Sequence, residues 1–132
     1  MADGLETYLA SLPDKLTEQL SDVIREQAER LSQAQREALQ ALERSPDETG
    51  RLEESCVVVP SDNPLEFIVQ AGGPLTTKEV REGSGVEYDY AVGFEFGTSR
   101  QAARSFFFNT YEAMRDDMQQ AIDDAVSEVL ND

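Results

Sequence analysis

The chain contains no histidine and a single cysteine among its 132 residues. Without histidine, it lacks the usual base that activates a serine or cysteine nucleophile, and it also lacks the commonest zinc ligand. Cys56 has no second cysteine with which to form an intrachain disulfide. Its place in the run Ser55-Cys56-Val57-Val58-Val59 predicts a buried apolar side chain and not a nucleophile. We therefore expect no enzyme activity, no catalytic residue and no cofactor.

Basic residues are also scarce: 11 Lys and Arg stand against 27 Asp and Glu, which gives a formal charge of −16. Contacts with phosphate groups need Lys and Arg, so this balance argues against a free nucleic-acid-binding protein. No apolar run approaches the ~20 residues that cross a bilayer. The acidic, charged N-terminus does not have the layout of a signal peptide. We expect a soluble protein that is made in the cytosol and has no membrane partner.

The residues that are present predict one folded domain over residues 1–132. The hydrophobic content of 39% argues against full disorder, and the length allows one modest core. Residues 1–44 are predicted to be helical, and residues 45–98 to be mainly β with a flexible loop over 72–85. Residues 99–132 are predicted to form a basic loop and an acidic C-terminal helix. The predicted fold class is α+β, with a long N-terminal helix, a small antiparallel sheet with a long hairpin loop, and a C-terminal helix packed on the sheet.

The N-terminal pattern is that of an amphipathic helix, because apolar residues recur at steps of three or four. Pro13 interrupts the pattern and Ser11 is a good N-cap, so a short first turn is expected to meet a longer helix over about residues 12–42. The opposite face carries mixed charges, which is typical of a solvated surface. A helix of this length is unusual in a small domain, which leaves packing against another subunit open.

The middle of the chain predicts strands. Residues 52–59 and 65–70 read as an antiparallel hairpin closed by the turn Ser61-Asp62-Asn63-Pro64. The glycine-rich stretch over 72–85 matches no phosphate-binding pattern, so it is either a merely mobile loop or an assembly contact that orders on docking. Residues 86–96 alternate apolar and polar side chains, which predicts a further strand; a short helix over residues 90–92 is the alternative.

The C-terminal helix, predicted from Phe107 onward, is strongly acidic. From Thr110 to Asp132 it carries seven Asp and Glu against Arg115 alone, and acids in its last turn oppose the helix dipole. It is either a solubilising surface or a face turned toward passing DNA or a basic partner, with Asp116, Asp117, Asp123 and Asp124 as the candidate DNA-repelling residues. A metal-dependent hydrolase is not expected, because adjacent Asp residues diverge by about 100° and partners seven residues apart are ~11 Å apart.

Four short motifs lie between the N-terminal helix and the last helix. A tight turn, a basic loop and an aromatic helix entry follow one another, which suggests a scaffold for assembly. The motifs are Asp47-Glu48-Thr49-Gly50-Arg51-Leu52-Glu53-Glu54-Ser55, Tyr88-Asp89-Tyr90-Ala91, Glu95-Phe96-Gly97-Thr98 and Ala103-Arg104-Ser105-Phe106-Phe107.

In order and spacing these motifs resemble the neck and tail-completion family of long-tailed bacteriophages, which includes head–tail joining and tail-terminator-type proteins and has members in gene transfer agents. The similarity runs from Asp47 to the C-terminus, with Ser105 where the family has proline. It implies a structural virion protein that forms a homo-oligomeric ring, expected to be a hexamer, between capsid connector and tail tube. The implied partners are other copies of the chain, the tail tube protein and the neck stopper or connector proteins, with DNA passing through unbound.

The resemblance also implies candidate interface residues. The turn at residues 95–98 would aim the loop that carries Arg100 and Arg104, whose cations would pair with acids of a neighbouring copy or else be solvated. At least one residue of the Phe106-Phe107-Phe108 run is expected at a subunit contact, because a helix cannot turn all three toward one core. The full candidate set is Glu95, Phe96, Gly97, Thr98, Arg100, Arg104, Phe106, Phe107, Lys78 and Arg81.

A second hypothesis is an acidic protein-binding module, for instance a DNA mimic that occupies a basic protein. Such a mimic is expected to be a monomer or a dimer, whereas a neck protein is expected to form rings. The oligomeric state therefore distinguishes the two hypotheses.

Overall fold

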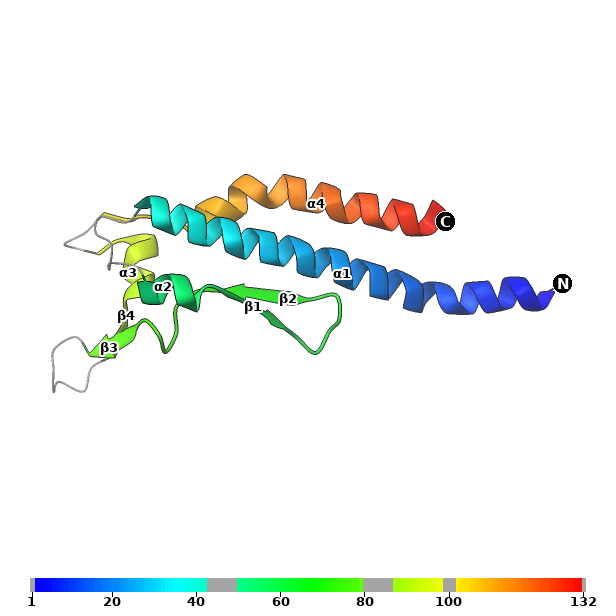
Figure 1. Ribbon diagram of the computed structural model, residues 1–132, viewed down its shortest axis with the longest axis horizontal. Coiled ribbons are helices and arrows are strands. Elements are labelled where there is room, and N and C mark those ends of the chain that lie inside the picture. The colour runs from blue at the N-terminus through cyan, green and yellow to red at the C-terminus, as the bar shows by residue number, and fades with distance from the viewer. Residues whose placement is uncertain (1, 43–49, 80–86, 99–101, 132) are drawn as a thin grey trace.

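The computed structural model describes residues 2–42, 50–79, 87–98 and 102–131, and its fold class is α+β, as predicted. A long N-terminal helix, a two-stranded antiparallel sheet and a C-terminal helix pack together (Figure 1). The elements are α1 (Ala2–Leu42), α2 (Gly50–Ser55), β1 (Val57–Pro60), β2 (Phe67–Gln70), β3 (Thr77–Glu79), β4 (Glu87–Asp89), α3 (Tyr90–Phe96) and α4 (Phe108–Asn131).

Helix α1 is continuous from Ala2 to Leu42 and passes through Pro13, so the predicted break near Pro13 is wrong. Proline removes one backbone donor, and here that loss falls on an exposed position of a 41-residue helix. The many other hydrogen bonds of the helix hold it together on both sides. The first turns of α1 extend beyond the end of α4 (Figure 1).

Helix α4 runs back along α1 in the opposite direction (Figure 1). Ala125 and Val129 of α4 are buried, as are Ala28 and Leu31 of α1. Each of these pairs follows the three- or four-residue spacing that places side chains on one face of a helix. The second neighbour of α1 is the β1–β2 sheet, so α1 is the central element of the molecule.

Strands β1 and β2 form the predicted hairpin, with Val57 opposite Gln70 and Pro60 opposite Phe67. The predicted start of the first strand at Leu52 is wrong, because residues 50–55 form the short helix α2. Leu52 and Ser55 are both buried, and the Ser55 hydroxyl donates to the Leu52 carbonyl at 2.6 Å. The three-residue spacing of these buried residues fits a helix and not a strand.

The predicted strand over residues 86–96 is also wrong in its second half. Only Glu87–Asp89 is a strand, paired with Thr77–Glu79, and Tyr90–Phe96 is helix α3. Ala91 and Phe94 are buried three residues apart, so tertiary packing selects the helical period over the alternating one. The predicted loop over 72–85 contains β3 in its described part; residues 80–86 lie outside the described residues.

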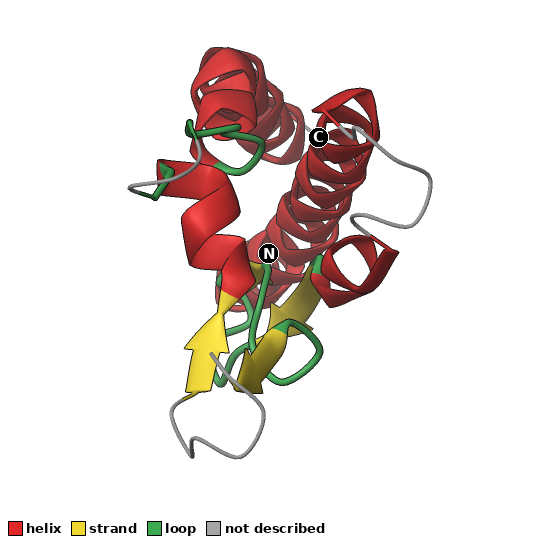
Figure 2. Ribbon diagram, turned by 90° about the vertical axis from the view of Figure 1, so that its left-hand side faces the viewer, coloured by secondary structure: helices red, strands yellow, loops and turns green. Residues whose placement is uncertain are grey.

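The hydrophobic core lies at one end of the molecule, where the last turns of α1 meet α2, α3 and the segment before α4 (Figures 1 and 2). Phe94 and Phe106 pack edge to face with ring centroids 5.8 Å apart. Such geometry is favourable for two aromatic rings. The remaining core residues are Leu39, Leu52, Cys56 and Ala91.

Candidate interaction surface

The carboxylate of Glu95 binds the start of helix α4. The residue is only 6% exposed, and its oxygens accept from the backbone N–H groups of Phe106, Phe107 and Phe108 at 3.0–3.2 Å. The Ser105 hydroxyl adds a fourth donor at 2.5 Å. The Phe108 N–H belongs to the first turn of α4, where N–H groups have no partner within the helix and carry partial positive charge, and the Phe106 and Phe107 N–H groups lie just before it. The carboxylate satisfies all three. Glu95 thus fastens α3 to α4.

This contact explains the helix entry. Helix α4 begins at Phe108, so Ser105 and Phe106 lie before the helix and not within its first turn. Ser105 serves as a donor to the Glu95 carboxylate, and Gln35 of α1 donates to the Phe107 carbonyl at 3.1 Å. The segment before α4 is therefore held from two sides by side chains distant in sequence.

Gly97 ends helix α3 with a φ of 84° and donates its N–H to the Gly93 carbonyl at 2.8 Å. Residues other than glycine rarely adopt this backbone conformation. The change of chain direction predicted at Gly97 is confirmed, whereas Glu95 and Phe96 of the predicted turn are the last residues of helix α3. Phe96 is exposed before it, and Thr98 is exposed after it.

Arg104 lies inside its own chain. Its side chain is buried, with the guanidinium 3.9 Å from the centre of the Phe94 ring and Nη1 donating to the Leu42 carbonyl at 3.3 Å. Its backbone N–H donates to the Phe94 carbonyl at 2.8 Å. A cation over an aromatic face and a bond to a helix C-terminal carbonyl are both stabilising. In the single chain, Arg104 connects α1 with α3.

Asp89 holds several segments together, a structural role that the sequence patterns did not predict. Its carboxylate caps α3 through the Ala91 N–H and also accepts from the Gly73 N–H and the Thr76 hydroxyl. Burial raises the pKa of this carboxyl, but the hydrogen bonds from Thr76, Gly73 and Ala91 together lower it by more. The pKa of Asp89 therefore lies below its ordinary value of 3.8. A side chain on Gly72, where φ is 89°, would meet the Asp89 carboxylate at 2.8 Å. The available signal was its place just before residues 90–92, where a short helix was the alternative to the predicted strand.

An exposed aromatic patch forms where α3 meets α4. Phe96 is 65% exposed and Phe108 is 50% exposed, and their ring centroids are 5.9 Å apart. Val92, one turn earlier on α3, is also exposed. We call Val92, Phe96 and Phe108 the aromatic patch. Of the predicted interface residues, Phe96 belongs to it, Phe107 is half-buried beside it, and Phe106 is buried in the core.

An apolar groove continues from this patch between α1, β2 and α4. It encloses about 490 Å³. Its polar lining is confined to a few side chains, chiefly Gln27, Gln35, Glu112, Arg115 and Gln119. Its apolar lining is Ile24, Ala28, Leu31, Phe67, Val69, Phe107, Phe108, Tyr111, Met118 and Ile122, and we call this site the α1–β2–α4 groove. Open apolar surface bounded by polar residues is typical of a protein-binding site.

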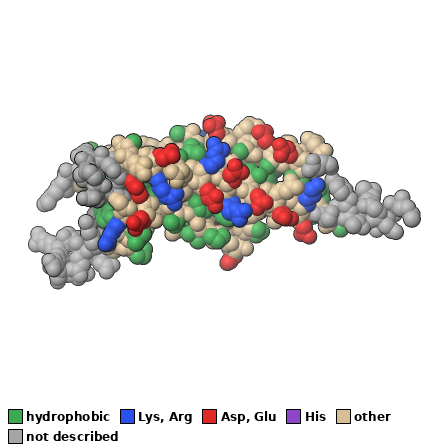
Figure 3. Space-filling view, in the orientation of Figure 1, with side chains coloured by type: hydrophobic (Ala, Val, Ile, Leu, Met, Phe, Trp, Pro, Cys, Tyr) green, Lys and Arg blue, Asp and Glu red, His purple; other side chains and the backbone are tan. Residues whose placement is uncertain are grey.

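The four aspartates of the predicted acidic face are all exposed. Asp116 lies 3.8 Å from the Arg115 guanidinium, while Asp123 and Asp124 accept from Gln119 and Gln120 one turn earlier. Arg115 also lies 3.6 Å from Glu112. On the side of the molecule that Figure 3 presents, acidic and basic side chains are interspersed among hydrophobic ones.

Of the other predicted contact residues, Lys78 alone falls within the described ranges. Lys78 is the middle residue of β3, opposite Tyr88. Arg81 and Arg100 lie outside the described residues. The role of Lys78, Arg81 and Arg100 at a subunit interface therefore stays a prediction.

Cys56 is fully buried, as predicted. Burial raises the pKa of its thiol to about 11, despite the nearby Arg36 guanidinium. Its thiol donates to the Leu52 carbonyl, and its own carbonyl accepts from Arg36. The described residues contain no group of three Asp, Glu or Cys side chains that could hold a metal ion. None of the helices in the described ranges is long and apolar enough to span a bilayer.

Comparisons with protein-family models, with curated proteins and with solved structures found no match to this chain.

Proposed function

We propose that the protein is a structural subunit that assembles into a ring at the head–tail neck or the tail end of a bacteriophage or a related particle, where it joins the capsid connector to the tail tube. The resemblance of its motifs to neck and tail-completion proteins supports this role. The aromatic patch is the observation that carries the proposal, because it lies at the Glu95-Phe96-Gly97-Thr98 motif that bears the resemblance.

The patch has the properties of a contact between subunits. Two phenylalanines that are at least half exposed lie side by side, and burying one of them stabilises an interface by about 2 kcal/mol before ordering costs. The backbone beneath them is held by the buried Glu95 carboxylate. A rigid site with exposed aromatic residues loses little entropy when a partner covers it.

The cellular test is electron microscopy of particles made without this protein. Filled heads separate from tails are the expected result, because the joint between them would be missing. Particles of normal appearance would contradict the proposal.

The biochemical test uses the mass of the assembled protein, measured by light scattering with and without the tail tube protein. We expect rings for the wild type, and smaller species for Phe96→Ala. Ile68→Ala is the matched control, since Ile68 is also exposed but lies on β2 outside the patch. A protein that stays monomeric under both conditions would contradict the ring and favour the acidic binding module. Equal effects of the two substitutions would remove the patch from the interface.

A further inference from the structure

We infer that the α1–β2–α4 groove is a docking site for a basic amphipathic segment of a different protein, and not for a second copy of this chain. The inference deepens the proposed function by naming the chemistry of a partner, and its importance in assembly depends on that function. The acidic edge of the groove and the lack of any matching segment in this chain carry it.

The acidic edge lies along α4. Glu112 and Gln119 line the groove. Asp116 comes four residues after Glu112, and Asp123 comes four residues after Gln119, so the two aspartates are seven residues apart. Residues at these spacings share one face of a helix. Three carboxylates against the single guanidinium of Arg115 leave this edge with a net charge of −2. A partner that fills the apolar groove therefore meets negative charge beside it.

The other two aspartates of the acidic face, Asp117 and Asp124, do not lie at the edge of the groove. Asp117 and Asp124 each follow an edge residue by one position, so they point about 100° away from it around the helix. Both pairs are exposed, both are seven residues apart, and one member of each accepts a hydrogen bond from a glutamine one turn earlier. The two pairs differ mainly in their distance from the groove, which makes one the control for the other.

A second copy of the chain does not fit this charge pattern. No ten-residue window of the sequence contains more than two Lys or Arg, so the chain lacks a basic amphipathic segment of its own. Any segment of a second copy comes from a chain with a formal charge of −16, so charge does not favour such a segment beside the acidic edge of the groove. Opposite charge, in contrast, speeds the encounter and favours the correct partner.

The groove also has a suitable length. Its α4 wall runs from Phe108 to Ile122, which corresponds to about 21 Å of helix, or about four turns. Apolar side chains at Phe108, Tyr111, Met118 and Ile122 recur along that wall. A helix laid into such a groove presents apolar anchors at positions i, i+3, i+4 and i+7.

The experiment measures binding of two labelled synthetic peptides to the full chain by fluorescence anisotropy. One is an amphipathic peptide of leucine and lysine of about 18 residues, and the other keeps the leucines but replaces every lysine with glutamate. We expect the lysine peptide to bind and the glutamate peptide not to bind. Asp116→Lys combined with Asp123→Lys is expected to weaken binding about tenfold, because it reverses two edge charges. Asp117→Lys combined with Asp124→Lys has the same net charge and is expected to change binding less than threefold.

Further measurements test whether the peptide binds in the groove and whether the natural occupant is a different protein. Tyr111→Ala is expected to weaken the lysine peptide without changing the circular dichroism of the protein, since Tyr111 is exposed in the groove. Equal weakening by both pairs of substitutions would overturn the inference, because it would show general charge attraction. Self-association of the wild type that Tyr111→Ala abolishes would also overturn it in favour of a second copy. Since binding is measured on purified protein, normal particles in the deletion strain would refute the neck role and leave this site standing.

Discussion

Two inward-turned carboxylates, Asp89 and Glu95, organise the backbone of a strongly acidic protein. Most acidic residues of this chain are on the surface, and a substitution at one of those surface positions is expected to have little effect on stability. Asp89 and Glu95 differ because each accepts from several backbone N–H groups. The residue type alone could not identify them among 27 acidic residues, because the donors come from segments distant in sequence.

Asp89 is expected to make folding dependent on pH. Its pKa is lowered in the folded state, so its contribution is present above the ordinary value of 3.8 and is lost as pH falls through the folded pKa. Asp89→Asn is expected to lower the free energy of unfolding by about 1 kcal/mol at pH 7. The difference from wild type is expected to shrink below about pH 4. Urea unfolding at pH 7, 5 and 3 measures it.

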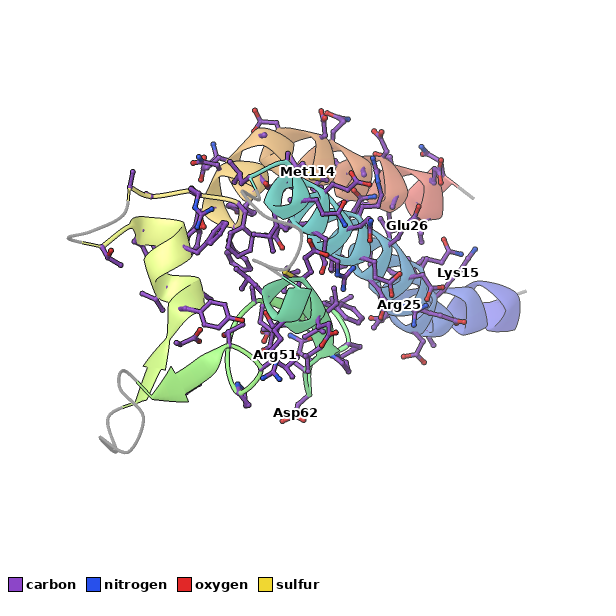
Figure 4. All side chains as sticks on the ribbon, turned by 60° about the vertical axis from the view of Figure 1, so that its left-hand side comes forward. Lys15, Arg25, Glu26, Arg51, Asp62 and Met114 are labelled. Carbon is purple, nitrogen blue, oxygen red and sulfur yellow. The ribbon has the colours of Figure 1, made fainter. Side chains whose placement is uncertain are left out.

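The control for this experiment is Asp62→Asn, in the exposed turn between β1 and β2 (Figure 4). This substitution is expected to change stability by less than about 0.5 kcal/mol at each pH. A difference between wild type and Asp89→Asn that stays constant down to pH 3 would argue against the proposed role of the ionised carboxylate.

At the scale of elements, α3 is, like α2, a segment that the sequence pattern assigned to a strand and that forms a helix in the structure. Its alternation of aromatic and small or acidic residues fits a strand as well as a helix, and local periodicity cannot separate the two over seven residues. The Asp89 cap and the burial of Ala91, Phe94 and Glu95 against the core decide for the helix. The Glu95 side chain then reaches α4, a contact that a strand would not place in the same way.

Removing the Glu95 carboxylate is expected to loosen the connection between α3 and α4. Glu95→Ala leaves several buried N–H groups without an acceptor, so we expect the free energy of unfolding to fall by about 2–4 kcal/mol. Glu95→Gln keeps one acceptor oxygen and is expected to lose about half as much. Guanidinium unfolding followed by circular dichroism measures both. Glu54→Gln, at an exposed position of α2, is the control, and losses equal to that control would contradict the role of Glu95.

At the scale of the whole molecule, α1 is a central rod with α4 on one side and the β1–β2 sheet on the other (Figure 1). The core is concentrated at one end, and the groove opens along the middle. Met114 of α4 and Glu26 of α1 line one shallow hollow, and Lys15 lies farther toward the N-terminus of α1 (Figure 4). This arrangement leaves several large apolar side chains exposed, among them Val92, Phe96 and Leu130.

The net charge is expected to weaken the folded molecule through repulsion among its own carboxylates. Raising NaCl from about 20 mM to about 0.5 M shortens the Debye length, so we expect the melting temperature to rise by about 3 °C. Each Asp→Lys change adds two charges, so Asp117→Lys with Asp124→Lys moves the formal charge from −16 to −12. This variant is expected to show a smaller rise. A melting temperature that is insensitive to salt would contradict self-repulsion.

Part of the candidate site could be anticipated from the chain alone. The turn at Gly97 and the acidic residues of α4 follow from motif and composition. The exposure of Phe96 does not, because the alternating pattern placed Phe96 on the same apolar face as the buried Phe94. The burial of Phe106 and Arg104 could not be anticipated, because it depends on where α1, α3 and the segment before α4 meet. The groove was missed for the same reason, since its three walls come from separate parts of the sequence.

Local patterns were sufficient for the two long helices, the β1–β2 hairpin, the buried Cys56 and the α+β class. These features depend on periodicity, turn residues and hydrophobicity, which act over a few neighbouring residues. Only the tertiary structure decided the helical state of residues 90–96, the inward role of Glu95 and the shape of the groove. Each of these depends on hydrogen bonds or packing between distant segments, whose free energy outweighs weak local preferences.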